Sequence, residues 1–194
     1  MLELDLSKTA EEKAYVEKWK KMIGVPAPHK NIQEIMSDER SLYFFGQGRD
    51  ATLSFIQKFA GVNEDYNALY FDEEYAKKSR WNGIIAPPLY PISVTDGLEV
   101  CLESVYDLLD EKGALAPKNK FPTFFHCYQA DAEWEFFEPV RPGDTIDSET
   151  KLIDMYWKQG KKYRLLFFVD ETIYTNQHGK KIARFLSTDV RLFR

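Results

Sequence analysis

The sequence predicts an α+β fold in which helices come first and an antiparallel sheet follows. Apolar residues recur at helical spacing as far as about residue 111, and from residue 123 onward they alternate with polar residues between short turn signals. This order is typical of an architecture in which a long helix covers the apolar face of a sheet. A chain of 194 residues with 44% hydrophobic and 29% charged residues has the size and composition of one compact domain. We expect that domain at 51–194, after an N-terminal helical extension at 1–50.

Four helices are predicted before the sheet. In the first, over 9–23, the aromatic and apolar residues lie on one stripe. A second, short helix ends at Gly61, and a third, over 72–80, begins with Asp72 at the N-cap position. The longest, over 90–111, repeats apolar residues at helical spacing and would be about 30 Å long, which is the width of a small domain. We expect this helix to lie along the sheet.

Four strands are predicted after the helices. The first alternating run covers 130–136, and the turn at Pro142-Gly143-Asp144 leads into a second run over 146–152. The third covers 165–174 and the fourth 182–193. The third opens with five apolar residues in succession, which indicates a central strand covered on both faces. The residues expected on the buried face of the first strand are Ala130, Ala132, Trp134 and Phe136.

Charge and hydropathy exclude several kinds of partner. The 26 lysine and arginine residues are scattered among 31 aspartate and glutamate residues, so the net charge is −5. Nucleic acid is not an expected partner, because a polyanion requires a clustered positive surface. No stretch approaches the roughly 20 apolar residues of a membrane span, and the acidic start lacks the basic segment of a signal peptide. Cys101 and Cys127 define no disulfide framework, and no residue cluster has metal-ligand spacing. We therefore expect a cytoplasmic protein without membrane or metal.

Four segments, in consistent order along the chain, resemble motifs of the MaoC-like dehydratases, or R-specific enoyl-CoA hydratases. Their active-site loop reads Asp-x-Asn-Pro-(Leu/Ile)-His, and residues 65–70 read Asp-Tyr-Asn-Ala-Leu-Tyr. Their Ile-Ala-His-Gly sequence, which opens a long central helix, corresponds to Ile-Ala-Pro-Pro at 85–88. The family's Arg-Pro-Gly-Asp hairpin matches 141–144, and its later strand and turn match 172–177. No single segment is specific, but together they extend over about two-thirds of the chain.

The resemblance implies a hot-dog fold, in which a curved antiparallel sheet wraps a long central helix, so 51–194 would form a single MaoC-like hot-dog domain. It implies that two such units pair to form a site for an acyl thioester, carried by CoA or by acyl-carrier protein, with no further cofactor. The N-terminal-type units of the family, which this chain resembles, pair with a catalytic unit in the same chain or in another. The implied activity is that of a lyase of lipid metabolism, either an enoyl-CoA hydratase or a 3-hydroxyacyl-thioester dehydratase.

Two positions that carry chemistry in this family are changed. In the hydratases, the aspartate and histidine of the loop activate water, and the amide at the glycine of His-Gly faces the thioester oxygen. Asp65 stands at the aspartate position, but Tyr70 replaces the histidine, and a phenol with a reference pKa near 10 is a poor base at neutral pH. Pro88 replaces the glycine and has no backbone N–H. Loss of acid–base help costs about 10²–10⁴ in rate and loss of an oxyanion donor about 10²–10³, so this half-site is expected to be nearly silent.

The candidate site residues have alternative interpretations that the sequence leaves open. Asp65 and Asn67 are either degenerate residues of the catalytic loop or turn residues whose side chains bond nearby backbone. Tyr70 is either a donor at the acyl site or an aromatic packing residue. His126 either faces the cavity or is a hydrogen-bonded core residue. The residues expected to bind the acyl thioester are Ala86, Pro87, Pro88, Leu89 and His126.

Three functions fit these observations. The first is the substrate-binding, non-catalytic subunit of an acyl-CoA dehydratase or enoyl-CoA hydratase, in a heteromer with a catalytic MaoC-like subunit. The second is a homodimer that binds or assembles acyl-CoA without a reaction of its own. The third is a self-sufficient hydratase or thioesterase with an altered site, using Asp65 with Tyr70 or His126. The retained motifs beside the altered Tyr70 and Pro88 favour the first function.

Overall fold

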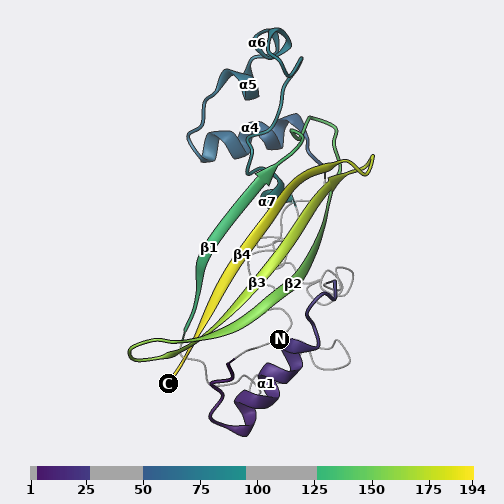
Figure 1. Ribbon diagram of the computed structural model, residues 1–194. Helices are drawn as coiled ribbons and strands as arrows, with labels where there is room; N and C mark the ends of the chain where they lie inside the picture. Colours follow the sequence, from purple (N-terminus) through teal and green to yellow (C-terminus); the bar gives the residue numbers. More distant parts are fainter. Residues whose placement is uncertain (1–3, 27–49, 95–125) are drawn as a thin grey trace, which may run out of the picture.

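The computed structural model describes residues 4–26, 50–94 and 126–194, and within them helices precede an antiparallel sheet, as predicted (Figure 1). The predicted helix over 90–111 begins there as a short turn of helix, and its remainder from residue 95 lies outside the described residues. The helices are α1 (Ala10–Lys20), α4 (Leu53–Val62), α5 (Ala68–Phe71), α6 (Glu73–Lys78) and α7 (Pro91–Val94). The strands are β1 (His126–Phe136), β2 (Ile146–Gln159), β3 (Arg164–Asn176) and β4 (Lys181–Phe193).

The helix starts follow from local sequence. Thr9, Thr52 and Asp72 each accept a hydrogen bond from a backbone N–H in the first turn of α1, α4 and α6. The predicted N-cap at Asp72 is therefore confirmed. α1 ends at Lys20, three residues before its predicted end, and Ile23 is exposed. The helix α5 was not predicted, because four residues are too few to show a helical period.

The four strands form one antiparallel sheet in the order β1-β4-β3-β2 (Figure 1). β3 is a central strand, as its apolar run predicts, and alternate residues along it are buried. A bulge at Ile153 shifts the register between β2 and β3, so Met155 and Trp157 stay on the same buried face as Leu152. The bulge lets β2 continue well beyond the predicted run over 146–152.

β1 lies where it was predicted, but the prediction of its buried face is wrong. Ala130, Ala132 and Phe136 are exposed, and Trp134 is half-buried. One cause is position, because β1 is the outermost described strand on its side of the sheet and is hydrogen-bonded to β4. The other is a bulge at Ala130, which breaks the alternation on which the prediction rested.

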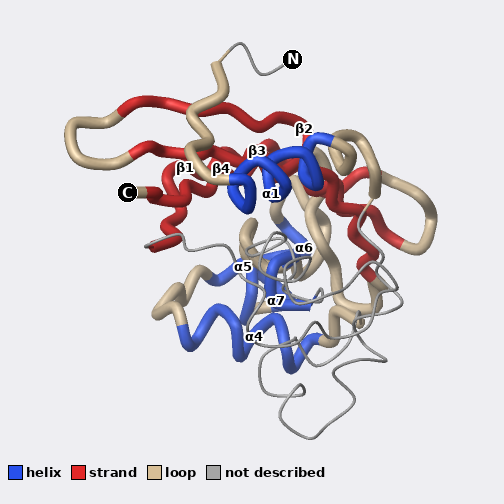
Figure 2. The backbone as a smooth tube through the Cα atoms, turned by 90° about the horizontal axis from the view of Figure 1, so that it is seen from below, coloured by secondary structure: helices blue, strands red, loops and turns tan. Residues whose placement is uncertain are grey.

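The helices cover one face of the sheet at its two ends. α1 lies at the end near the C terminus, whereas α4–α7 gather at the other end (Figure 1), and Figure 2 shows α4, α5 and α7 on one side of the strands. The cluster under α1 consists of Tyr15, Val16, Trp19, Leu152, Met155, Trp157, Leu166, Phe168 and Phe193. The cluster at the other end consists of Ala51, Ile56, Ala86, Tyr90, Val140, Ile146, Tyr174, Ile182, Ala183 and Phe185.

Buried polar side chains separate the two apolar clusters on the same face. The hydroxyls of Thr150 and Thr172 are 2.9 Å apart, on adjacent strands. Asp170 is only 1% exposed, and within the described part of the chain neither of its carboxyl oxygens has a hydrogen-bond partner. Burial, and then the negative charge of Asp189, raise the pKa of Asp170 to about 8. The Asp170 carboxyl is therefore largely protonated at neutral pH.

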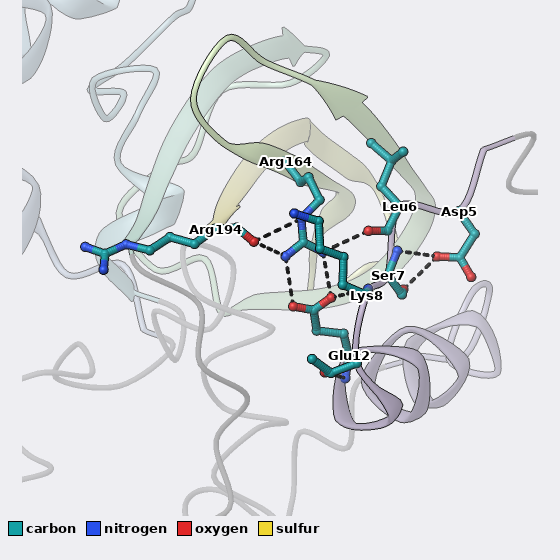
Figure 3. A network of polar contacts seen from close by, with 8 residues as sticks. Asp5, Leu6, Ser7, Lys8, Glu12, Arg164 and Arg194 are labelled. Carbon is teal, nitrogen blue, oxygen red and sulfur yellow. Dashed lines mark hydrogen bonds and ion pairs between the residues drawn. The ribbon is translucent and has the colours of Figure 1, made fainter.

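A buried arginine attaches α1 to the sheet. Arg164, which opens β3 and is 4% exposed, donates to both carboxylate oxygens of Glu12, at 2.6 and 3.0 Å (Figure 3). Its guanidinium also donates to the backbone oxygens of Leu6, at 2.8 Å, and of Arg194. The hydrogen bond from Arg164 lowers the pKa of Glu12, so the pair stays ionised down to acidic pH. Three segments that are distant in the sequence are joined by this one side chain.

Candidate functional site

The loop before α5 is shaped by the side chains of Asp65 and Asn67. The Asn67 side chain caps α5 by accepting a hydrogen bond from the backbone N–H of Leu69, at 3.0 Å. The Asp65 carboxylate accepts one from the backbone N–H of Asn67, at 3.3 Å. Both residues are exposed, and both make the local turn contacts that the sequence left open as one alternative.

Tyr70 lies at the base of this loop and is 6% exposed. Its ring packs in a small cluster with Ala60 and Ile85. Burial, and then the negative charge of Asp65 and a hydrogen bond to that carboxylate, raise the pKa of Tyr70 above its ordinary value of 10.0. The structure thus places the residues at the family's aspartate and histidine positions close enough for the Asp65 charge to act on the Tyr70 phenol. A phenol with a raised pKa keeps its proton at neutral pH and cannot act there as a general base.

Backbone hydrogen bonds bring the other motif segments beside this loop. The N–H of Ile85 donates to the carbonyl of Leu69 at 3.4 Å, and the N–H of Ala86 donates to the carbonyl of Val140 at 2.8 Å. The guanidinium of Arg141 donates to the carbonyl of Trp81 at 2.8 Å. The loop at 65–70, the segment at 85–88 and the hairpin at 141–144 therefore form one contiguous surface at the α4–α6 end of the sheet (Figure 1).

The residues expected to bind the thioester differ in their exposure to solvent. Ala86 and Pro87 are buried, whereas Pro88 and Leu89 are exposed at the turn that leads into α7. The carbonyl of Pro87 accepts the N–H of Tyr90 at 2.9 Å, which is part of this turn. Pro88 has no N–H to direct at a ligand. The side chain of His126 lies outside the described residues.

Sequence reasoning missed two residues of this region. Tyr90 is fully buried, its ring meets Phe59 edge to face at 5.6 Å between centroids, and its hydroxyl has no hydrogen-bond partner in the described ranges. Burial raises the pKa of Tyr90 to about 12, so its hydroxyl is a neutral donor. Arg141 was quoted as part of a hairpin motif without a role, yet it ties the hairpin to the segment before Ile85. The Arg-Pro-Gly-Asp motif could have identified Arg141. A buried tyrosine at the start of a helix, in contrast, has no sequence pattern that predicts its burial.

No metal centre and no membrane helix emerge from the described residues. In the ranges 4–26, 50–94 and 126–194, no group of three or more histidine, cysteine, aspartate or glutamate side chains could hold a metal ion. In the same ranges, no helix is long and apolar enough to span a bilayer.

The long antiparallel sheet, with the loop and hairpin joined at one end, defines a hot-dog protein of the dehydratase type. A family described as "FAS1-like, dehydratase domain region" matches residues 50–185, and the chain belongs to this family. Its match covers β1, β2, β3, the start of β4 and all three joined segments. The expected MaoC-like resemblance is thereby confirmed at the level of the family and the fold.

Individual relatives are more distant. A UPF0336 protein from Thermobifida fusca is 25% identical over 100 residues, which span 52% of this chain and 58% of that relative. The structure of a MaoC-like dehydratase from Rhodospirillum rubrum is similar with a TM-score of 0.50 at 20% identity, covering 78% of this chain and 90% of the other. The ChsH1–ChsH2 complex from Mycobacterium tuberculosis contains a chain similar with a TM-score of 0.54 at 15% identity, covering 84% and 96%. At such identities the two structures show the shared fold.

Proposed function

We propose that this chain is the substrate-binding, non-catalytic subunit of an acyl-thioester dehydratase or enoyl-CoA hydratase. A catalytic MaoC-like subunit would supply the proton-transfer groups, and the substrate would be an acyl-CoA or an acyl-carrier-protein thioester. No cofactor is required, and the expected location is the cytoplasm. The observation that carries the proposal is the burial of Tyr70 at the histidine position, where the phenol holds its proton under the influence of the Asp65 charge.

The chemistry of hydration supports this division of roles. Water must lose a proton as it attacks the enoyl thioester, and the thioester oxygen gains negative charge in the same step. Burial, and then the charge of Asp65, raise the pKa of the Tyr70 phenol, which removes it as a base at neutral pH. Pro88 offers no N–H for the developing charge. Without acid–base help, which is worth about 10²–10⁴ in rate, and without one oxyanion donor, worth about 10²–10³, this half-site would turn over slowly.

Substrate binding requires only a shaped surface, and that surface is retained. The backbone bonds that join Leu69 to Ile85 and Val140 to Ala86 do not depend on which side chain stands at position 70 or 88. The neighbouring cluster around Tyr90 is apolar, as the acyl part of a thioester requires. The similar chain in the ChsH1–ChsH2 complex was solved in an assembly of two components, and a paired arrangement is what we propose here.

Crotonyl-CoA hydration tests the proposal, measured with the purified chain alone and with the chain mixed with a MaoC-like subunit that carries the Asp–His loop. We expect the chain alone to be slower than the mixture by about 10³ or more. Tyr70→Phe should leave the rate of the mixture within about twofold, because the phenol transfers no proton. Tyr66→Phe, at an exposed tyrosine of the same loop, is the matched control.

Two outcomes would overturn the proposal. Full activity of the chain alone that survives both Asp65→Ala and Tyr70→Phe would show catalytic groups elsewhere in the chain. Activity of the chain alone that is lost in Asp65→Asn would identify a self-sufficient enzyme with an altered site. Calorimetry with butyryl-CoA then distinguishes a binding subunit from a homodimeric assembly module. The proposal requires the thioester to bind to the mixed complex of this chain and the catalytic subunit.

A further inference from the structure

Two arginines contact Trp81 at the margin of the candidate site. The guanidinium carbon of Arg80 lies 4.3 Å from the centroid of the Trp81 ring, and the guanidinium of Arg141 donates to the Trp81 carbonyl at 2.8 Å. Arg80 follows α6, and Arg141 opens the hairpin at 141–144 (Figure 1). Two cations from distant segments of the chain therefore contact one residue.

Neither guanidinium has a carboxylate partner in the described part of the chain. Arg164 and Arg184, in contrast, each form an ion pair with a glutamate. An arginine side chain carries five N–H donors, and the bond from Arg141 to Trp81 ends on a neutral carbonyl oxygen. Both the positive charge and several donors of this pair therefore remain available to an anion.

The acidic side chains near the pair are engaged by other groups. Asp144 accepts a hydrogen bond from the backbone N–H of Arg141 at 2.8 Å, not from its guanidinium. On α6, carboxylate oxygens of Glu73 and Glu74 lie 2.9 and 3.7 Å from the ammonium of Lys77. These acids therefore do not take the place of a ligand at the two arginines.

Gly83 leaves the Arg141 guanidinium uncovered on one side. A Cβ atom at Gly83 would lie 3.8 Å from Nη1 of Arg141, so a side chain there would stand against the guanidinium. The φ of +145° at Gly83 is also one that other residues rarely adopt. Arg141 is half-buried and Arg80 is exposed, so the pair is partly removed from water but reachable from it.

The pair lies on the same surface as the segment expected to bind the thioester. The carbonyl of Val140, directly before Arg141, accepts the N–H of Ala86 at 2.8 Å. Trp81 precedes Ala86 by five residues, which at about 3.6 Å per residue places the two within about 18 Å. In acyl-CoA and in acyl-carrier protein, a long flexible pantetheine arm joins the thioester to a phosphate group. An anion site near the thioester segment, but separate from it, fits such a ligand.

We propose that Arg80 and Arg141 bind the phosphate of a phosphopantetheine arm and so hold the carrier end of the substrate while its thioester lies at 85–88. The inference rests on the proposed function, because that function supplies the acyl-thioester ligand. Guanidinium groups match phosphate oxygens with paired N–H donors, and a charge without a carboxylate partner gains most from a bound anion. CoA and acyl-carrier protein share this phosphate, so the phosphate is the group that is recognised.

Two thioesters that differ by one phosphate test the site. Calorimetry compares butyryl-4′-phosphopantetheine with butyryl-pantetheine, using the chain alone and its mixed complex with the catalytic subunit. We expect wild type to bind the phosphorylated thioester at least about tenfold more tightly. Arg80→Gln/Arg141→Gln should lower this ratio of dissociation constants by at least about tenfold. A variant that only distorts the surface would weaken both thioesters alike and leave the ratio unchanged.

Control variants make the result specific. Lys161→Gln/Lys162→Gln removes two positive charges from the exposed turn before β3, at the α1 end of the sheet, and should keep the wild-type ratio. If the double arginine variant does not fold, Arg80→Gln alone, at an exposed side chain, should lower the ratio at least about threefold. The preference for the phosphorylated thioester should shrink at about 1 M salt.

Butyryl-CoA and a butyryl-carrier protein then identify the source of the phosphate. Given the phosphate preference, a loss of affinity in the arginine variant with only one of them supports the site and assigns it to that carrier. A wild-type ratio near one, an unchanged ratio in the arginine variant, an equal fall in the lysine control or no binding of either thioester would overturn the site. Each of these leaves the proposed function intact if the mixture hydrates crotonyl-CoA. A mixture no faster than the chain alone ends the proposed function, and the ratio still decides whether the chain binds phosphate.

Discussion

The buried carboxyl of Asp170 should make the protein less stable as pH rises across the neutral range. Burial, with the nearby charge of Asp189, raises the pKa of Asp170 from 3.8 to about 8 in the folded chain, whereas in the unfolded chain it ionises near its ordinary value. Between these limits the Asp170 carboxyl holds about one proton more in the folded state than in the unfolded state. The stabilisation is therefore complete below about pH 4 and is lost progressively as pH rises towards about 8.

The magnitude follows from the proton count. One extra proton in the folded state changes the free energy of unfolding by about 1.4 kcal/mol per pH unit, so the loss between about pH 5 and about pH 7 is roughly 3 kcal/mol. Asp170→Asn removes this titration with little change in side-chain shape. The free energy lost over the same interval should therefore fall by roughly 2–3 kcal/mol, whatever constant offset the substitution introduces.

Urea unfolding at several pH values measures the effect, with midpoints compared at constant m-value. Exposed Glu138 gives the matched control, because Glu138→Gln also removes one carboxyl but at the surface, and it should keep the pH slope of wild type. Asp189, whose pKa burial also raises, adds a smaller contribution of the same sign that persists in Asp170→Asn. An identical pH slope in wild type and Asp170→Asn would refute the reasoning.

Three further predictions concern packing and backbone shape. Glu12→Gln removes the carboxylate that pairs with the buried Arg164 guanidinium and should lower the free energy of unfolding by about 3–5 kcal/mol in urea titration, against less than about 0.5 for the exposed Glu11→Gln. Trp19→Ala empties the core of the α1 cluster and should cost about 3–5 kcal/mol by the same measurement. Gly143→Ala, at φ +93°, should lower stability by about 1–2 kcal/mol without a steric clash, a difference readable as a lower Tm.

The sequence was most informative where structure is decided locally. The caps of α4 and α6 rest on Thr52 and Asp72, whose side chains reach the first turn of their own helix. The turn at Gly143 is equally local and was predicted correctly. The apolar run correctly predicted β3 as a central strand, but only alternate residues of β3 are buried, so its two faces are not equally covered. The exposed face of β1 was not, because alternation indicates which residues share a face but not which strand lies at the edge. The bulge at Ala130 adds a shift that only the pairing with β4 reveals.

Buried charge was the other feature that the pattern of the sequence did not predict. Arg164 begins a strand after a lysine-rich turn, a position that suggests an exposed side chain, yet Glu12 meets it from a distant helix. Asp170 occupies an inward position of β3, where alternation alone predicts an apolar residue. At the candidate site, the quoted loop motif located Asp65 and Tyr70 but not the contact between them, because hydrogen bonding across a turn depends on backbone geometry.

The proposed binding role is compatible with the altered residues because of how the surface at 65–70, 85–88 and 141–144 is built. Its shape rests on backbone bonds from Ile85 to Leu69 and from Ala86 to Val140, and on a side chain, Arg141, that bonds a backbone carbonyl. None of these bonds uses the side chain at position 70. At the position of the family's histidine, a buried tyrosine can therefore pack against Ala60 and Ile85 without disturbing these backbone bonds. Loss of catalytic groups and loss of shape are therefore separable in this fold, and a partner that supplies the proton-transfer groups makes the first tolerable while the second would abolish binding.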